Sequence, residues 1–262
     1  MYAVERHDSI AELLRVEGRV VASDLAERFA VTTETIRRDL DSLEQAGALQ
    51  RVHGGAVAAG HTSVTELSLA EREDQQTPAK STIARLAAHL VPPTFVGSIA
   101  LDAGTTTAAV AAEFTGWTPA TPGVLLTVIT NAVPIAALLQ HSEHIDLRLL
   151  GGRVRGLTSA AVGSATVEQL TGLRPDIAFV GANGISAGFG LSTPDELEGA
   201  VKTAYIRAAR RAVAVVDSTK HGVEALSRFA RLDELDTVIT DLEPAADLAG
   251  ALRDADVEVL VA

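Results

Sequence analysis

The sequence predicts two parts: a small N-terminal domain of three helices and a β-hairpin, and a large α/β domain with a mostly parallel sheet. Within residues 1–60, apolar residues recur three times at helical spacing, and two short β-rich runs then flank a glycine pair. Within residues 81–262, seven apolar β-rich runs alternate with segments long enough for crossover helices, a pattern typical of a parallel sheet covered on both faces. The polar stretch 61–80 is expected to be a linker.

The first two helices of the small domain are predicted from short apolar stripes. Gly18 is placed to end the first, whose stripe consists of Ile10, Leu13 and Leu14. Ser23 is expected to cap the second, whose inward side chains are Leu25, Ala26 and Phe29. A short turn over residues 31–33 follows.

The third helix is predicted over residues 33–46 and ends at Gly47. Its inward stripe consists of Ile36, Leu40 and Leu43. Strands over residues 49–52 and 56–57 are joined through His53-Gly54-Gly55, which suits a tight hairpin. Three helices followed by a hairpin is the order of a winged helix-turn-helix.

The outward face of the third helix carries candidate DNA contacts. Arginine can donate two parallel hydrogen bonds to guanine or to phosphate, and a recognition helix presents its N-terminal residues to base edges. The hairpin adds a second basic position beside the groove. The candidate DNA-binding residues are Thr33, Glu34, Thr35, Arg37, Arg38, Arg51 and His53.

In the large domain the predicted strands end in polar or glycine-rich turns. The strands are expected over residues 98–101, 125–130, 147–150, 177–180, 212–216, 238–240 and 257–261, and helices over 106–114, 132–140 and 197–210. The carboxyl ends of parallel strands meet at one edge of a sheet, where open α/β sheets bind ligands. The turns therefore predict a binding site at that edge.

The turn 104–107 favours an anionic ligand, because its glycine lets backbone amides and threonine hydroxyls approach an oxyanion. No P-loop or dinucleotide fingerprint occurs, so no cofactor is expected. The candidate effector residues at the strand ends are Asp102, Gly104, Thr105, Thr106, Thr107, Asn131, Gly151, Gly152, Asn183 and Lys220.

Composition excludes several classes of protein and site. The chain has no cysteine and no paired-histidine spacing, which excludes disulfides, thiolate sites and cysteine nucleophiles and opposes a zinc site. No apolar run is long enough to span a membrane and the first residues carry no signal-peptide pattern, so a cytoplasmic protein is expected. The net charge is −12, and residues 1–60 contribute −3 from 7 basic and 10 acidic residues. DNA binding must therefore depend on a few well-placed arginines.

Two motifs resemble the DeoR family of bacterial transcription regulators: Thr35-Ile36-Arg37-Arg38-Asp39-Leu40 and the hairpin Arg51-Val52-His53-Gly54-Gly55-Ala56. The resemblance continues through Lys80, residues 101–107, 130–132, 150–152 and 181–185, Glu198, Lys202 and residues 217–220. It implies DNA contacts by Arg37 and Arg38. It also implies a sensor domain similar to ribose-5-phosphate isomerase that binds a phosphorylated sugar or related metabolite, and it adds Lys202 to the effector residues.

The hypothesis is a repressor of carbohydrate-metabolism genes whose affinity for operator DNA changes when the sugar phosphate binds. A homo-oligomer, dimer or tetramer, would place two winged domains on paired half-sites. The alternatives are a sugar-phosphate isomerase with an accessory N-terminal domain and a protein-binding scaffold. Family members commonly carry aspartate where this chain has Asn183, and an amide cannot serve as a general base, so no catalytic residue is expected.

Overall fold

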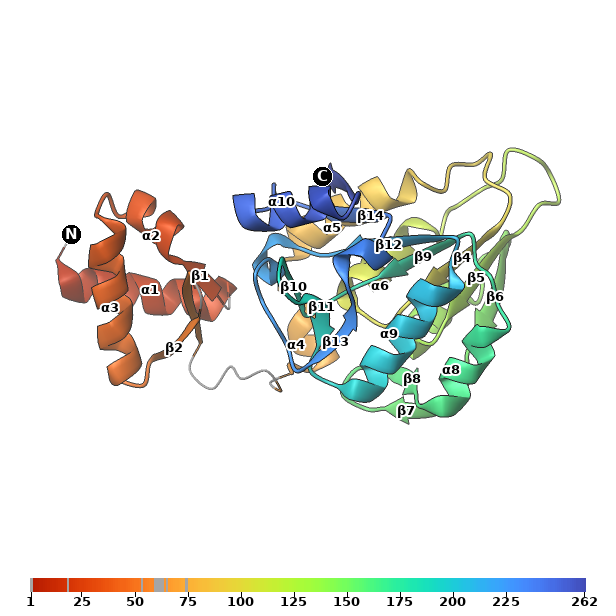
Figure 1. The fold of residues 1–262 in the computed structure, drawn as a ribbon. Coiled ribbons are helices and arrows are strands. Elements are labelled where there is room, and N and C mark those ends of the chain that lie inside the picture. Colours follow the sequence, from red (N-terminus) through yellow and green to blue (C-terminus); the bar gives the residue numbers. More distant parts are fainter. Residues whose placement is uncertain (1, 18, 53, 59–63, 65, 74) are drawn as a thin grey trace. The chain divides into compact units, whose positions relative to one another are not determined.

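The chain folds into two compact units, which we call unit 1 (Met1–Thr65) and unit 2 (Glu66–Ala262) (Figure 1). The computed structural model describes residues 2–17, 19–52, 54–58, 64, 66–73 and 75–262. Gly18 and His53, for which a helix stop and a DNA contact are predicted, lie outside these residues. Each unit is described by itself.

Unit 1 is a winged helix-turn-helix, as predicted. Its helices are α1 (Ala3–Glu17), α2 (Ala22–Arg28) and α3 (Thr33–Gln45), and its strands are β1 (Arg19–Val21), β2 (Leu49–Val52) and β3 (Gly55–Ala58). The strands form an antiparallel sheet in the order β1-β3-β2. Gly54 adopts a φ of 79° in the hairpin turn, in the left-handed region that glycine enters at no steric cost.

Two features of unit 1 differ from the sequence prediction. The strand β1 was not expected, because three residues are too few to show a period of two. Ser23 is not the cap of α2: the helix begins one residue earlier, Val21 occupies the cap position, and the Ser23 hydroxyl donates to Asp24 instead. The antiparallel pairing of β1 with β3 therefore sets the start of α2.

A buried ion pair joins α1 to α3 inside unit 1. Arg6 donates to both carboxylate oxygens of Asp39, at 2.5 and 2.9 Å, and both side chains are more than 90% buried. His7 lies 3.1 Å from the same carboxylate. The apolar core of unit 1 is formed by Ile10, Leu14, Val20, Ala22, Leu25, Ala26, Ile36, Leu40, Leu43, Leu49 and Ala56.

Unit 2 is built on a seven-stranded sheet in the order β15-β14-β12-β9-β4-β5-β6, and every neighbouring pair is parallel. Each predicted strand corresponds to one of these, with ends that differ by up to two residues. Their bounds are β4 Ser98–Leu101, β5 Leu126–Thr130, β6 Ile145–Leu149, β9 Ile177–Val180, β12 Arg211–Val215, β14 Thr237–Thr240 and β15 Glu258–Val261.

Helices cover both faces of this sheet (Figure 1). Neighbouring helices α5, α6 and α7 pack on one face, and α8 and α9 pack on the other. The helices are α4 Leu69–Glu73, α5 Thr77–Ala88, α6 Thr105–Glu113, α7 Val133–Leu139, α8 Ser164–Thr171, α9 Glu196–Ala208 and α10 Ala246–Asp254. None of the helices in the described part of the chain is long and apolar enough to cross a membrane.

Shorter elements that the sequence does not predict surround the sheet edge. They are the hairpin of β7 (Arg153–Arg155) and β8 (Ala160–Val162), the antiparallel sheet of β10 (Gly184–Ser186), β11 (Gly190–Thr193) and β13 (Ser227–Ala230), and two 3-10 turns, η1 (Ser218–Lys220) and η2 (Leu232–Glu234). Strands of three or four residues are too short to show a clear alternation of apolar and polar side chains.

The stretch 61–80, expected to be a linker, is largely part of unit 2. From Glu66 onward the chain contacts this unit, α4 lies within the stretch, and α5 begins at Thr77. The polar composition of the stretch suggests a linker, but several of its polar side chains line a cleft of unit 2.

We expect Asp39→Asn to destabilise unit 1 by about 3–5 kcal/mol, since it leaves the buried Arg6 guanidinium without its counter-charge. Chemical denaturation followed by far-UV circular dichroism measures this loss. The fluorescence of Trp117, the one tryptophan, reports on unit 2 and should not change.

Asp41→Asn is the matched control, because its ion pair with Arg51 is partly exposed and should contribute less than about 1 kcal/mol. Equal stability of the two variants would contradict a structural role for the Arg6–Asp39 pair.

Candidate functional site

The helix α3 presents two exposed arginines near its N-terminus. The Arg37 and Arg38 side chains are 59% and 78% exposed, and both approach Glu34, at 3.9 and 3.4 Å. Thr32 caps the helix by accepting from the Thr35 amide at 3.1 Å. Because Ile36 and Leu40 are buried on the opposite side, the arginines are held outward on a fixed helix. The predicted residues Thr33, Glu34, Thr35, Arg37 and Arg38 thus share one accessible end of α3.

Arg51 of the hairpin is engaged within unit 1. Its guanidinium pairs with Asp41 on α3, and its backbone amide donates to Glu44 at 2.7 Å. These contacts fasten the hairpin to α3. The structure therefore gives Arg51 a partner inside the unit, whereas the sequence pattern predicts a contact with DNA.

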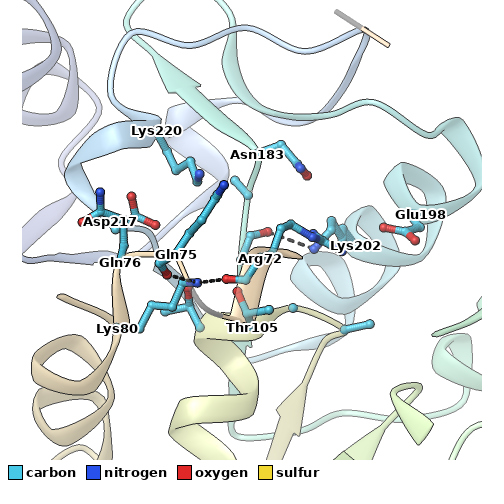
Figure 2. Close-up of a pocket in the computed structure, with 15 residues that line it drawn as sticks. Arg72, Gln75, Gln76, Lys80, Thr105, Asn183, Glu198, Lys202, Asp217 and Lys220 are labelled. Atoms are coloured by element: carbon cyan, nitrogen blue, oxygen red, sulfur yellow. Dashed lines mark hydrogen bonds between the residues drawn. The ribbon is translucent and has the colours of Figure 1, made fainter. Parts of the chain in front are cut away.

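A polar cleft of unit 2 lies at the carboxyl ends of β4, β9 and β12 (Figure 2). It contains about 560 Å³ of empty space including its open mouth. The strand-end turns 103–106 and 181–183 form part of the wall, together with Asp217 and Lys220 after β12 and two side chains of α9, Glu198 and Lys202. The remaining wall comes from Arg72, Gln75, Gln76 and Lys80.

Six of the predicted effector residues line this cleft: Gly104, Thr105, Thr106, Asn183, Lys202 and Lys220. The helix α6 begins here, with Gly104 at its cap, and Ala108 makes the first intrahelical hydrogen bond back to Gly104. The amides of Thr105 and Thr106 have no earlier carbonyl within the helix, so this end of α6 favours negative charge.

Beside the cleft, Lys202 and Asp102 form a buried ion pair, which we call the floor. The Lys202 ammonium donates to Asp102, which follows β4, and to the Gly181 carbonyl at 3.0 Å. The Gly181 amide donates to the same carboxylate at 3.0 Å. The second carboxylate oxygen, Oδ1 of Asp102, is buried without a hydrogen-bond partner among the described residues. One acceptor is thus left unused below the strand-end turns.

Asn131 and Thr107 support the floor rather than the cleft wall. Asn131 donates to the Ala161 carbonyl at 2.8 Å and accepts from the Tyr205 hydroxyl at 3.1 Å. Burial, helped by the nearby charge of Asp102, raises the pKa of Tyr205 well above its usual value, so its hydroxyl remains a donor. The Thr107 hydroxyl donates to the backbone carbonyls of Asp102 and Gly104 and fixes the turn before α6.

Gly151 and Gly152, predicted as effector residues, do not line the cleft. They follow β6, at the edge of the sheet and two strands away from β4. Gly151 exchanges hydrogen bonds with Gln169 of α8. Gly152 adopts a φ of 156°, and a Cβ there would stand 2.2 Å from the Thr166 hydroxyl. Gly151 and Gly152 thus form a close contact between the loop after β6 and the helix α8.

Hydrogen bonds fix the conformation of the turn after β12, which places Lys220 at the cleft. Asp217 accepts from the Thr219 amide at 3.1 Å, and Asp241, which follows β14, accepts from the Ser218 amide at 2.6 Å. Asn183, which follows β9, accepts at its side-chain oxygen from the Thr193 hydroxyl at 3.1 Å, which leaves its amide nitrogen as a possible donor at the cleft.

Positive charge is concentrated in this cleft. The whole chain has three lysines, Lys80, Lys202 and Lys220, against 19 arginines, and all three lysines line it. Burial, the largest influence, lowers the pKa of Lys80 to about 8; repulsion from Lys220 and Arg72 acts in the same direction and Asp217 opposes it. Figure 2 shows these side chains around one space. The cations repel one another unless an anion lies between them.

The motifs do not predict that Arg72, Gln75 and Gln76 line the cleft, because these residues fall in the stretch expected to be a linker. The scarcity of lysine is the sequence signal that could have directed attention to this stretch, since its last residue, Lys80, is one of only three lysines in the chain. For metals, no group of three or more ligating side chains occurs within the part of the chain that the structure describes.

Comparison with known proteins agrees with both units. Residues 6–62 match the DeoR-like helix-turn-helix domain, and residues 75–242 match the DeoR C terminal sensor domain. The glycerol-3-phosphate regulon repressor of Escherichia coli (strain K12) is 30% identical over 259 residues, which are 99% of each chain. The HTH-type transcriptional repressor GlcR of Bacillus subtilis (strain 168) is 32% identical over 262 residues, covering 100% of this chain and 97% of GlcR.

The lactose phosphotransferase system repressor of Lactococcus lactis subsp. lactis is 34% identical over 236 residues, 90% of each chain. Among solved structures, ribose 5-phosphate isomerase A from Neisseria gonorrhoeae is similar at a TM-score of 0.36 and 14% identity, covering 56% of this chain and 54% of the isomerase. The two domain matches and the full-length relatives show that the chain belongs to the DeoR family of transcriptional regulators.

Proposed function

We propose that the protein is a DNA-binding repressor of carbohydrate-metabolism genes whose operator affinity changes when a phosphorylated sugar or related metabolite binds in the cleft of unit 2. The observation that carries this proposal is the cluster of cations in the cleft of a chain whose net charge is −12. The relatives, which are repressors of glycerol-3-phosphate and lactose phosphotransferase genes, support the same class of ligand.

For DNA, the proposal assigns Arg37 and Arg38 to base edges and phosphates, with Thr33, Glu34 and Thr35 beside them. Unit 1 carries more acidic than basic residues, so its non-specific affinity for DNA should be weak. Two copies of the chain on paired half-sites would supply the missing affinity and sequence selectivity. Arg51, paired with Asp41, would act mainly by holding the hairpin against α3.

For the effector, the proposal places the phosphoryl group between the N-terminus of α6 and the cations Lys80 and Lys220. Lys202 is already neutralised by Asp102 and contributes little net charge. The amide of Asn183, which lines the cleft, is suited to a sugar hydroxyl. The proposal includes no catalytic step, since Asn183 cannot take up a proton as a general base.

We expect Arg38→Ala to weaken operator binding about 5- to 150-fold, the range for loss of one bidentate arginine contact of about 1–3 kcal/mol. The operator would be a duplex selected from a random library by the wild-type protein, and affinity would be measured by gel-shift titration. Arg85→Ala, which removes an exposed arginine of α5, is the control. Unchanged affinity for Arg38→Ala would refute the assignment.

We expect at least one sugar phosphate to raise the melting temperature of the wild-type protein, since a ligand at 100 times its Kd stabilises by about 2.7 kcal/mol. The panel is sn-glycerol 3-phosphate, glucose 6-phosphate, fructose 6-phosphate and ribose 5-phosphate, with the unphosphorylated compounds as controls. Lys220→Gln should lose this shift and keep operator affinity, whereas Arg253→Gln, outside the cleft, should keep both. A panel without effect, or a full shift in Lys220→Gln, would overturn the proposed site.

The affinity for the phosphorylated ligand should fall as the pH rises from 7 to 9. Lys80, with a pKa of about 8, loses its proton in this range, while a phosphomonoester stays dianionic because its second pKa is about 6. We expect Kd to rise about 3- to 10-fold by isothermal titration calorimetry. Operator affinity without ligand, which depends on arginines that remain charged, serves as the reference. A flat profile for the ligand would place the phosphoryl group away from Lys80.

A further inference from the structure

The helices α8 and α9 leave an exposed surface on unit 2. They precede the neighbouring parallel strands β9 and β12, so they lie side by side and run in the same direction (Figure 1). Their carboxyl ends meet where the Arg174 guanidinium, just beyond α8, donates to the backbone carbonyl of Arg207 at 3.4 Å. We call the exposed side chains of residues 164–174 and 196–207 the α8–α9 face.

A groove runs along the α8–α9 face between the two helices and contains about 920 Å³ of empty space including its open mouth. The Thr203 hydroxyl donates to the carbonyls of Gly199 and Phe229, at 3.0 and 2.7 Å, so this polar group is satisfied within unit 2. Apolar hollows with a polar rim are typical of interaction sites. The apolar side chains of the lining are Val167, Leu170, Leu173, Ala200, Ala204 and Ala208.

Four exposed charged side chains surround the groove: Glu168, Arg174, Glu196 and Arg207. None of the four forms an ion pair with another of the residues that the structure describes. Their charges sum to zero on a chain whose net charge is −12. A second copy of this acidic chain therefore meets less repulsion at the α8–α9 face than over the rest of an acidic surface.

The order of charge along α9 makes its exposed side complementary to itself. Glu196 is the first residue of the helix and Arg207 lies in its last turn, about 16 Å further along. Helical spacing places both on one side of α9 with Ala200 and Thr203 between them. When two copies of α9 lie antiparallel about a two-fold axis, Glu196 of each copy stands opposite Arg207 of the other. The small side chains between them allow the helices to approach closely.

Leu197 provides a side chain that fits the groove. It is 39% exposed and lies in the same helical row as Ala204 and Ala208, seven and eleven residues further on. In the antiparallel arrangement, Leu197 of one copy stands opposite residue 206 of the other, which lies between Ala204 and Ala208. Each copy thus fills part of the groove of the other.

We propose that the α8–α9 face joins two copies of this chain in a two-fold dimer, with reciprocal Glu196–Arg207 ion pairs and Leu197 of each copy in the groove of the other. The function proposed above calls for two copies on paired half-sites, and this inference adds the surface that joins them. The face shares no lining residue with the ligand cleft. A two-fold axis in unit 2 would match the symmetry of an operator with inverted half-sites.

The test exchanges charges across the interface and measures dimer dissociation by sedimentation velocity over a dilution series of the full-length protein. Arg207→Glu places two carboxylates opposite each other at two symmetric positions, and Glu196→Arg places two guanidiniums there. Each variant alone should raise the dissociation constant of the dimer about 10- to 100-fold. An equimolar mixture of the two variants should recover near wild-type affinity, because each copy then meets the opposite charge at both positions.

Arg85→Glu is the matched control. Arg85 is an exposed arginine in the last turn of α5, so its replacement disturbs the interaction of a charge with the helix dipole in the same way as Arg207→Glu does. The dissociation constant should not change in this control. Circular dichroism confirms that each variant is folded.

A wild-type protein that stays monomeric throughout the micromolar range would overturn the proposal. So would an unchanged dissociation constant in both single variants, which would place the contact on another surface, or single variants that dissociate and do not recover on mixing. None of these results bears on ligand binding in the cleft or on the contact of Arg38 with DNA, which are tested separately above.

Discussion

The cleft of unit 2 depends on one buried interaction, the ion pair between Asp102 at the end of β4 and Lys202 on α9. Two charges at this depth need further hydrogen bonds, and Gly181 supplies a carbonyl for the ammonium and an amide for Oδ2 of the carboxylate, whereas Oδ1 has no partner among the described residues. The pair thereby fixes three elements, β4, the turn after β9 and the helix α9, around one point. Gly104, Asn183 and Lys202 of the cleft lining belong to these elements or directly follow them, whereas Arg72, Lys80 and Lys220 come from α4, α5 and the turn after β12.

Charge is divided between the floor and the wall of the cleft. Lys202 is paired with Asp102 on the floor, Glu198 with Arg155, and Arg72 with Glu66 at 4.0 Å, so the remaining charges of the lining are those of Lys80, Lys220 and Asp217. A chain with an excess of acidic residues can present an anion site in this way because the excess is spread over exposed surface, where water and salt screen it. Unit 1 likewise combines local positive charge, from the two exposed arginines of α3, with a net negative charge.

The sequence predicted the parts of the fold that have a clear period. The seven buried parallel strands read as apolar runs, and the third helix of unit 1 shows its stripe of Ile36, Leu40 and Leu43. Strands of three residues and the start of α2 were not predictable, because tertiary pairing rather than local pattern determines them. The same holds for the cleft: strand-end turns identified one wall, whereas Arg72 and Gln75 look like linker residues until the fold brings them there. Gly151 and Gly152 share the sequence signature of a strand-end turn, but their strand lies at the sheet edge.

The placement of lysine has a practical consequence for chemical work on the protein. Every ε-amino group of the chain lies in one cleft, since Lys80, Lys202 and Lys220 are its only lysines. Two of the three are more than 90% buried, which leaves Lys220 as the most accessible. Reagents that couple to primary amines, such as succinimidyl dyes or biotin esters, would therefore attach at the cleft and at the chain terminus, and surface immobilisation through amines would block the cleft rather than orient the protein at random.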